Sequence, residues 1–471
     1  MQQNVVLVCL DTVRKDYYDE FASRLAEAAN VTYEQCRSAS AWSTPSHASI
    51  LTGELPNEHG VHTHNNDFTT LSQTNTIIGD LEDHTAIGVS ANLFAGPQYG
   101  FDELFDRFTA VDPDVLFQDA WEPLNVSGHG VKRYVEYVKE ARSKGKLSKY
   151  TANFLVYQLN QYLNDLPVKS LQDKGASAII SESLRQIRDT DGPFFLFTNF
   201  MDAHQPHYSF RGLDESLHDV PVTWSSADGF HDIKWEINRA DGVAENTEFL
   251  EQFKQLYSAS IEYLDRAVLE FIKRIRAETD GDTTFIITAD HGENLGSAAD
   301  EFMFEHTSSL SEGLLHVPMI LINAPISGSM HVTEYASHLA LPELIQGLAR
   351  GQLPDITRDR VASEVVGLAP GGADFTPDER RYYDRLIRAV YEGERKHVWD
   401  SMGGQTVYEL DADRPCWQEA ADRPEGLPEW KSEFFPEPAD KVKSRCAGDE
   451  VPEEKSVDEF AEARLRDLGY L

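Results

Sequence analysis

The sequence has few cysteines, few basic residues and no long apolar run, and each shortage excludes a class of protein. Its 471 residues include four cysteines, which are scattered without the close spacing of a metal-binding motif. In a reducing compartment we expect these thiols to be free. No apolar run could span a bilayer, and no basic leader or small-residue cleavage site precedes the first apolar stretch. We therefore expect a soluble, cytoplasmic protein without a membrane partner.

Basic residues are strongly outnumbered. The chain has 42 Lys and Arg against 79 Asp and Glu, which gives a formal net charge of -37. The acidic residues are spread along the whole chain, a pattern typical of a solvated surface adapted to high salt, where the Debye length falls to about 3 Å at 1 M. Because the sequence has no basic patch, we expect no nucleic-acid partner.

Short apolar runs alternate with helical patterns, and there is no internal repeat. Helical periodicity covers residues 175–187 and 248–279. The predicted strands are residues 5–10, 85–90, 194–199, 284–288 and 319–322. Continuous apolar strands separated by helices predict an α/β fold with a mostly parallel central sheet and helices on both faces. At this length a second, smaller unit is also expected.

The pattern changes from about residue 360. Short strand patterns joined by turns predict a small antiparallel subdomain, with strands at residues 361–367, 388–391, 396–400 and 406–410. We expect an irregular wrap over residues 411–451 and an amphipathic helix over 456–468, with Ser456 as its N-cap. The sequence is therefore divided into a larger domain, residues 1–355, and a C-terminal subdomain, residues 356–471.

Polar motifs directly follow two of the predicted strands. Asp11 comes after residues 5–10, and the adjacent pair Asp290 and His291 comes after residues 284–288. Ligand sites of parallel sheets lie beyond the carboxyl ends of the strands, so these side chains could share one divalent cation. Each motif alone is also explained by a helix cap or a turn.

Two further motifs carry groups suited to catalysis. Ser43 stands two residues before Pro45 and a helical stretch, and backbone N–H groups at a helix N-terminus stabilise anions. An ordinary helix start is the alternative interpretation. His204 follows residues 194–199 and is a candidate acid, base or oxyanion contact, although a single histidine is often structural.

Together, in this order, the motifs resemble the sulfatase family of the alkaline-phosphatase superfamily. The resemblance covers residues 4–325 and resumes in the C-terminal subdomain. It is carried by Ser43-Thr44-Pro45-Ser46-His47 followed by Leu51-Thr52-Gly53, and by the stretches at residues 56–61 and 316–318. The closing residues 466–471 are similar to the ends of family members from salt-loving archaea.

The resemblance implies a fold of the alkaline-phosphatase type and a metal site. By position, Asp11, Asp290 and His291 would bind one divalent ion, and Ser43 would be the nucleophile that touches it. Carboxylates favour Ca²⁺, while the imidazole of His291 also suits Mn²⁺ or Zn²⁺.

The resemblance also assigns roles around the substrate. Asn92 would hold a substrate oxygen, and His204 would assist at the departing oxygens. His306 falls near the place where relatives have a Lys or His beside the leaving group. Two departures are His47, in place of an Arg that steadies nucleophile and anion, and Thr12, where many sulfatases have a second Asp.

The identity of residue 43 leaves the reaction open. In the family this Cys or Ser is oxidised to formylglycine, whose hydrate attacks sulfur and then expels sulfate. An unmodified Ser43 would form a covalent ester that water must cleave, which suits phosphorus esters better than sulfate. We rank a sulfatase acting on a small-molecule or saccharide sulfate first. A phosphodiesterase or phosphonate monoester hydrolase is second, and an inactive binding homologue last. Residues 111–172 and 209–248 are expected insertions that select the organic group.

Overall fold

The centre of the molecule is an eight-stranded sheet. The computed structural model describes residues 2–113, 115–120, 139, 142–164, 168–239, 242–279, 283–306, 308–367, 375–422 and 426–447. The strands are β1 (Asn4–Leu10), β2 (Val31–Arg37), β3 (Thr85–Ser90), β4 (Arg107–Ala110), β5 (Phe194–Phe200), β6 (Thr283–Thr288), β7 (Met319–Ile322) and β8 (Met330–Ser337). Their order is β4-β3-β5-β1-β6-β7-β2-β8. Only β7 runs antiparallel to its neighbours, so the predicted mostly parallel sheet is confirmed.

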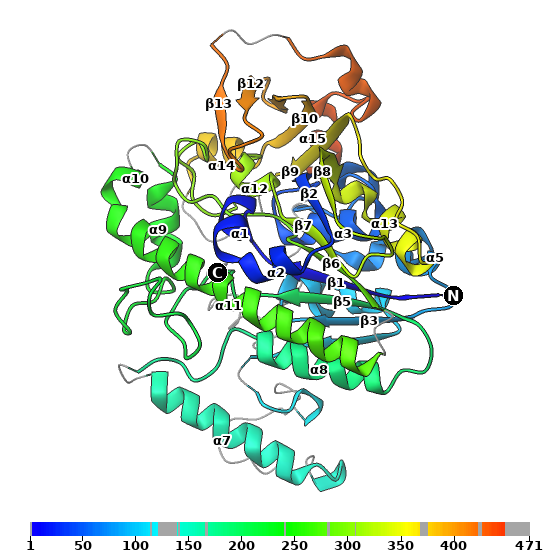
Figure 1. The fold of residues 1–471 in the computed structure, drawn as a ribbon. Helices are drawn as coiled ribbons and strands as arrows, with labels where there is room; N and C mark the ends of the chain where they lie inside the picture. The colour runs from blue at the N-terminus through cyan, green and yellow to red at the C-terminus, as the bar shows by residue number, and fades with distance from the viewer. Residues whose placement is uncertain are drawn as a thin grey trace.

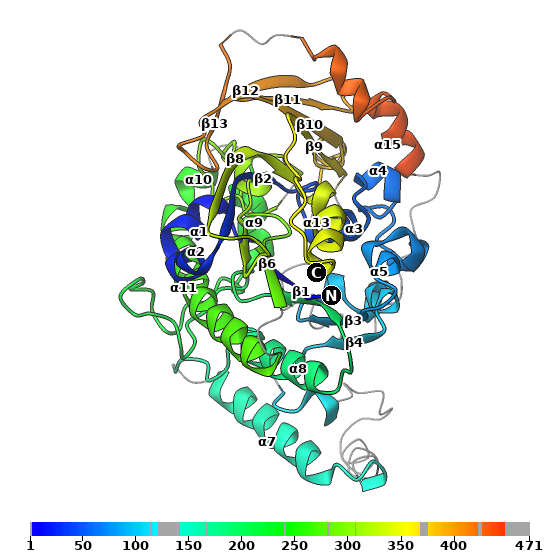
Figure 2. The ribbon, with the colours of Figure 1, turned by 45° about the vertical axis from the view of Figure 1, so that its right-hand side comes forward.

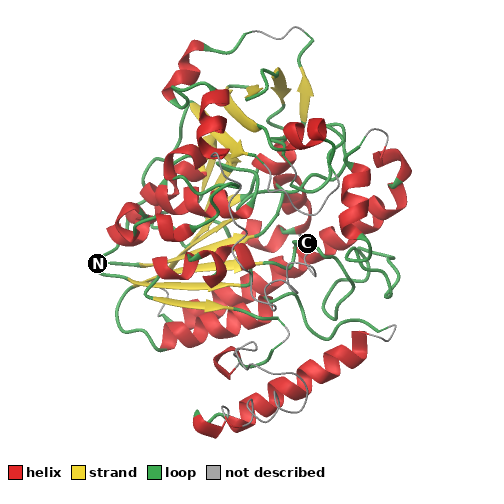
Figure 3. Cartoon of the chain, turned by 180° about the vertical axis from the view of Figure 1, so that it is seen from behind, coloured by secondary structure: helices red, strands yellow, loops and turns green. Residues whose placement is uncertain are grey.

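Helices cover both faces of this sheet (Figures 1 and 3). On one face, the long helix α11 (Thr247–Glu278) contacts α1 (Lys15–Phe21), α2 (Ser23–Ala28) and α8 (Ala176–Arg188). The other face is covered by α3 (Ser43–Thr52), α5 (Ile77–Asp80) and α13 (Leu341–Ala349). The inner strands β1 and β5 are mostly apolar and almost wholly buried, as expected for strands covered on both sides.

A second, five-stranded antiparallel sheet lies over the β2–β8 edge of the first (Figure 2). Its strands are β9 (Arg360–Val366), β10 (Leu386–Glu392), β11 (Arg395–Asp400), β12 (Gln405–Leu410) and β13 (Gln418–Ala420). The main-chain N–H of Glu364 donates to the carbonyl of Ala39 at 2.9 Å, which joins β9 to the segment after β2. The predicted C-terminal antiparallel sheet is therefore confirmed.

The remaining helices are short apart from one. They are α4 (Pro56–His59), α7 (Leu147–Asn164), α9 (Phe230–Ile237), α10 (Gly242–Glu245), α12 (Glu312–Leu315), α14 (Pro377–Tyr383) and α15 (Ala439–Ala447). Helix α7 belongs to the first expected insertion and lies beyond α8, at the margin of the molecule (Figures 1 and 2). None of the helices that the structure describes is both long enough and apolar enough to cross a bilayer.

Some predictions of local structure need correction. The stretch 411–451, predicted to be an irregular wrap, is irregular over only part of its described length, because it also contains β13 and α15. Helix α15 is rich in charge and buries only Ala439 and Val442, so its apolar signal is weak. The predicted helix at residues 456–468 lies outside the described residues. All four cysteines are free, as expected.

Candidate active site

Four neighbouring parallel strands deliver the predicted site residues to one edge of the sheet. In the order β3-β5-β1-β6, these strands are followed by Asn92, His204, Asp11 and Asp290. All four residues are buried. The expectation that the motifs meet beyond the carboxyl ends of the strands therefore agrees with the geometry.

Asp11, Asp290 and His291 converge on one point. One ligand atom from each lies within 4.8 Å of the others. Among the described residues, Oδ1 of Asp11 and Oδ2 of Asp290 have no hydrogen-bond partner, although both are buried. Two unpartnered buried carboxylate oxygens beside an imidazole nitrogen form a donor set that suits a divalent cation.

The backbone at Thr12 helps to orient Asp290. Thr12 has a φ of 62°, a left-handed conformation that is uncommon for a β-branched residue. Its N–H donates to Oδ1 of Asp290 at 3.3 Å, and its hydroxyl donates to the carbonyls of Asp11 and Ala203. The Thr12 hydroxyl therefore bonds to main-chain oxygens. Because the Thr12 N–H binds Oδ1 of Asp290, Oδ2 of Asp290 remains available to another partner.

The protonation states fit a cation site. Burial, and then the nearby Asp290, raise the pKa of Asp11 well above its usual value. Burial lowers the pKa of His291 to about 4, so its ring is neutral. Nδ1 of His291 donates to the carbonyl of Gly292 at 2.8 Å, because a carbonyl can only accept, and the lone pair is therefore on Nε2. That nitrogen is the one available to a metal.

Ser43 begins α3 and faces this cluster. Its Oγ lies 3.3 Å from Nε2 of His291 and accepts from Nδ2 of Asn92 at 3.1 Å. The N-cap of α3 is Trp42, which makes no side-chain capping bond, so Ser43 is not the cap. The side-chain contacts of Ser43 are therefore with the site, in favour of the catalytic over the capping interpretation.

Asn92 bridges Ser43 and Asp11. Its Nδ2 also donates to Oδ2 of Asp11 at 2.6 Å, while its Oδ1 accepts from the N–H of Phe94 at 2.7 Å. The last bond fixes the orientation of the amide. The Asn92 amide therefore points a donor at the Ser43 oxygen.

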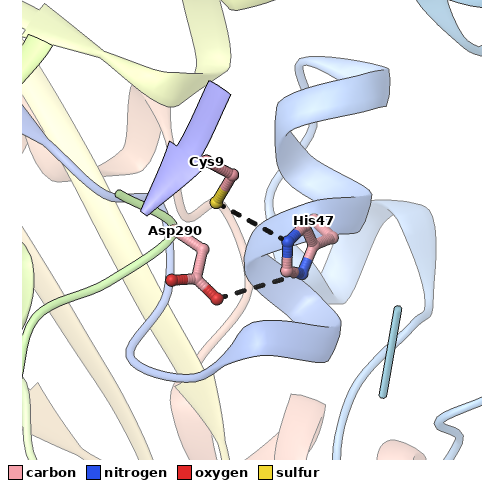
Figure 4. A group of neighbouring side chains, drawn as sticks. All are labelled: Cys9, His47 and Asp290. Carbon is pink, nitrogen blue, oxygen red and sulfur yellow. Dashed lines mark hydrogen bonds and ion pairs between the residues drawn. The ribbon is translucent and has the colours of Figure 1, made fainter. Parts of the chain in front are cut away.

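His47 follows Ser43 by one helical turn in α3. Its Nδ1 donates to the main-chain carbonyl of Ser43 at 2.7 Å, and its Nε2 accepts from Nδ2 of Asn199 at 3.0 Å. Burial lowers its pKa, so the ring is neutral. Figure 4 shows the ring of His47 facing both Cys9 and Asp290. Its Nε2 lies 3.8 Å from Sγ of Cys9, and its Nδ1 lies 3.9 Å from Oδ2 of Asp290. Cys9, His47 and Asp290 also bring ligand atoms within 4.8 Å of one another, but both ring nitrogens of His47 already make hydrogen bonds.

His306 completes a group of three histidines. Its ring centroid is 4.9 Å from that of His291 and 5.6 Å from that of His204. Burial lowers the pKa of His204 to about 3. Burial would also lower the pKa of His306, but Glu305 and Glu293 outweigh it and raise the pKa to about 9. The site thus holds a neutral imidazole beside a cationic one, which could donate a proton or stabilise an anion.

Sequence reasoning missed three residues that shape this site. Asn199 belongs to a predicted apolar strand, although its amide also lies 3.3 Å from Oδ2 of Asp11. Glu293 and Glu305 carry carboxylates 3.4 and 3.7 Å from the His306 ring. Glu293 stands two positions after His291, which could have drawn attention to it.

A family model described as sulfatase matches residues 3–351, well over half of the chain. A comparison with curated proteins finds no match.

Solved structures with the same fold are distant in sequence. The phosphonate monoester hydrolase of Silicibacter pomeroyi has a TM-score of 0.57 and 14% identity, covering 92% of this chain and 93% of that one. A 2-O GAG sulfatase has a TM-score of 0.53 and 13% identity, covering 87% and 85%. The protein BT4656, solved with its substrate D-glucosamine-2-N,6-O-disulfate, has a TM-score of 0.53 and 11% identity, covering 88% and 92%. At such identities the likeness shows the fold alone.

Proposed function

Since the chain belongs to the sulfatase family of the alkaline-phosphatase superfamily, we propose that it hydrolyses a sulfate ester by attack from residue 43 beside one divalent cation. The proposal rests mainly on one contact: Oγ of Ser43 lies 3.3 Å from Nε2 of His291. The nucleophile and the metal-binding group therefore share one buried point.

Asp11, Asp290 and His291 would hold the cation through Oδ1, Oδ2 and Nε2. The two carboxylates suit Ca²⁺, and the imidazole also suits Mn²⁺ or Zn²⁺. A bound cation would supply Lewis acidity and lower the pKa of a nearby hydroxyl. The unpartnered oxygens of Asp11 and Asp290 support this assignment.

The other site residues would orient the nucleophile, stabilise negative charge and assist the leaving group. Asn92 donates to Ser43 Oγ and so aligns the attacking oxygen toward the ester. The N-terminus of α3 favours the negative charge that develops there. The cationic ring of His306 and the neutral ring of His204, whose centroids are 5.6 Å apart, would give the leaving oxygen a proton or a hydrogen bond.

The second candidate is hydrolysis of a phosphonate monoester or a phosphodiester. It is favoured by the identity of residue 43, which is Ser in this chain. An unmodified serine would form a covalent ester, and phosphoserine is hydrolysed readily by metal hydrolases while a sulfated serine has no comparable exit. An inactive binding homologue is disfavoured, because the nucleophile and all three metal-binding residues are present together.

Two measurements on the purified protein separate the two candidates. Peptide mass analysis shows whether residue 43 has lost two hydrogens, as formylglycine requires. Turnover is then compared for para-nitrophenyl sulfate and para-nitrophenyl phenylphosphonate with Ca²⁺, Mn²⁺ or Zn²⁺. Modified residue 43 with faster sulfate turnover supports the sulfatase. Intact serine with faster phosphonate turnover supports the second candidate, and no turnover of either ester with any of the three metals contradicts both.

A further inference from the structure

The turn that carries His204 is held in place by Lys174 from the segment before α8. Nζ of Lys174 donates to the carbonyl of His204 at 2.5 Å and to the carbonyl of Pro206 at 3.2 Å. The main-chain N–H of Lys174 donates to Oδ1 of Asp202 at 3.0 Å. Lys174 therefore binds this turn at three positions, on both sides of the imidazole-bearing residue.

Lys174 is itself firmly anchored. Its neighbour Asp173 accepts a hydrogen bond from the hydroxyl of Tyr263 on α11 at 2.6 Å. Asp173 also accepts from the N–H and hydroxyl of Ser177 in the first turn of α8. Through Asp173, Lys174 is thus connected to α8 and α11. This connection limits how far the His204 turn can move.

Burial of the Lys174 ammonium group is energetically unfavourable, and two carbonyls compensate for it only in part. Lys174 is only 7% exposed, and burial lowers its pKa, with partial compensation from Asp202. Burying a charged group is unfavourable unless it is well paired. Perturbed ionisable groups of this kind cluster at functional sites, and this one binds the main-chain carbonyl of the residue that carries a candidate catalytic imidazole.

We propose that Lys174 is a positioning residue, which fixes the turn of residues 202–206 so that the imidazole of His204 faces the leaving group. The inference rests on the proposed function, in which His204 acts at the departing oxygen. Without the ammonium the turn can shift, and a misplacement of about 1 Å can cost about a hundredfold in rate. The loss should be largest when the leaving group is poor, because such a reaction depends most on assistance to the departing oxygen.

The first test is Lys174→Met, which keeps the chain length and removes the donors. We compare kcat and KM for an ester with a para-nitrophenyl leaving group and one with an alkyl leaving group, in the ester class that the parent hydrolyses. The matched control is Lys396→Met, since Lys396 is also buried and also donates to a main-chain carbonyl, that of Leu310, but in the second sheet. We expect Lys174→Met to lower kcat by about a hundredfold for the alkyl ester and much less for the nitrophenyl ester. Lys396→Met should change both esters equally.

The second test is a double-mutant cycle with His204→Ala. If Lys174 acts through His204, adding Lys174→Met to His204→Ala should change kcat little further. Equal losses for both esters, or fully additive losses in the cycle, would overturn the inference. If His204→Ala alone leaves turnover of the alkyl ester unchanged, the assigned role of His204 fails instead. Should Lys174→Met not fold, Lys174→Arg enters the same comparisons, because its differently shaped head group must also displace the turn.

Discussion

Oγ of Ser43 lies 3.3 Å from Nε2 of His291, although 248 positions separate the two residues in the sequence. Ser43 starts a helix on one face of the sheet, and His291 follows the strand next to β1. The two meet because the parallel strands end at one edge, where α3 also begins. In the proposed reaction, this contact would bring the nucleophile to the side chains that hold the cation.

Replacing Asp11 by Asn should stabilise the metal-free protein and remove most of the stabilisation that a bound metal gives. In the metal-free protein, Asp11 and Asp290 are buried carboxylates that repel each other, so Asp11→Asn should raise the melting temperature measured with a chelator. The parent should gain about 2.7 kcal/mol from a metal present at a hundredfold excess over its Kd. The variant should lose most of this gain.

Asp265→Asn is the matched control for the Asp11 variant. Asp265 is equally buried, but it accepts from the N–H of Leu25 and pairs with Arg24, away from the site. Its loss should lower the melting temperature and leave the response to metal intact. A metal response that survives in Asp11→Asn would contradict the assignment of Asp11.

Acid should weaken the connection between the two sheets at Glu312. Burial would raise the pKa of Glu312, but Arg37 and Lys396 outweigh it and lower the pKa to about 2. The contacts are 2.9 and 3.1 Å. Because the folded pKa lies below the value of 4.5 for a free Glu, this carboxylate stabilises the protein above pH 4.5. That stabilisation is lost as the pH falls from 4.5 toward 2.

Glu312→Gln tests this ion pair by denaturant unfolding. Near pH 7 the variant leaves Arg37 and Lys396 uncompensated and should lose about 3–5 kcal/mol. Near pH 3 the difference between parent and variant should shrink. A difference that is constant across this range would show that the charge of Glu312 is not what stabilises the contact.

Salt should stabilise the whole protein. The net charge of -37 makes the folded chain repel itself in dilute buffer, and molar salt shortens the Debye length to about 3 Å. We expect the melting temperature and the activity to rise together between dilute buffer and molar KCl, with the metal present throughout. Equal melting temperatures at both salt concentrations would contradict this expectation.

The fold class and the convergence of the main motifs could be predicted because both follow from local signals. The strands β1, β5 and β6 are built around short apolar runs, and the polar residues that follow them stand where parallel sheets place ligands. The strands β2 and β8 carry polar residues on partly exposed positions, so their apolar pattern is interrupted and sequence reasoning missed them.

The environment of the site residues depends on contacts distant in sequence. Nothing near His306 indicates that Lys234 pairs with Glu305, because Lys234 lies on α9 in the second expected insertion. Lys174 reaches the carbonyl of His204 across 30 positions. Asn199 sits among phenylalanines in β5, where a polar residue is easily overlooked. Such partners are defined only once the chain has folded.

The most direct test of the central claim is the turnover of Ser43→Ala beside Thr44→Ala. If Ser43 only began a helix, its replacement would cost about 0.5–2 kcal/mol of stability and leave turnover largely intact. In our account Ser43→Ala folds and binds metal, but loses several orders of magnitude in kcat on the ester that the parent prefers. Thr44→Ala, one residue further along the same helix, should be far milder. A Ser43→Ala protein that retains most of the parent activity would contradict the account.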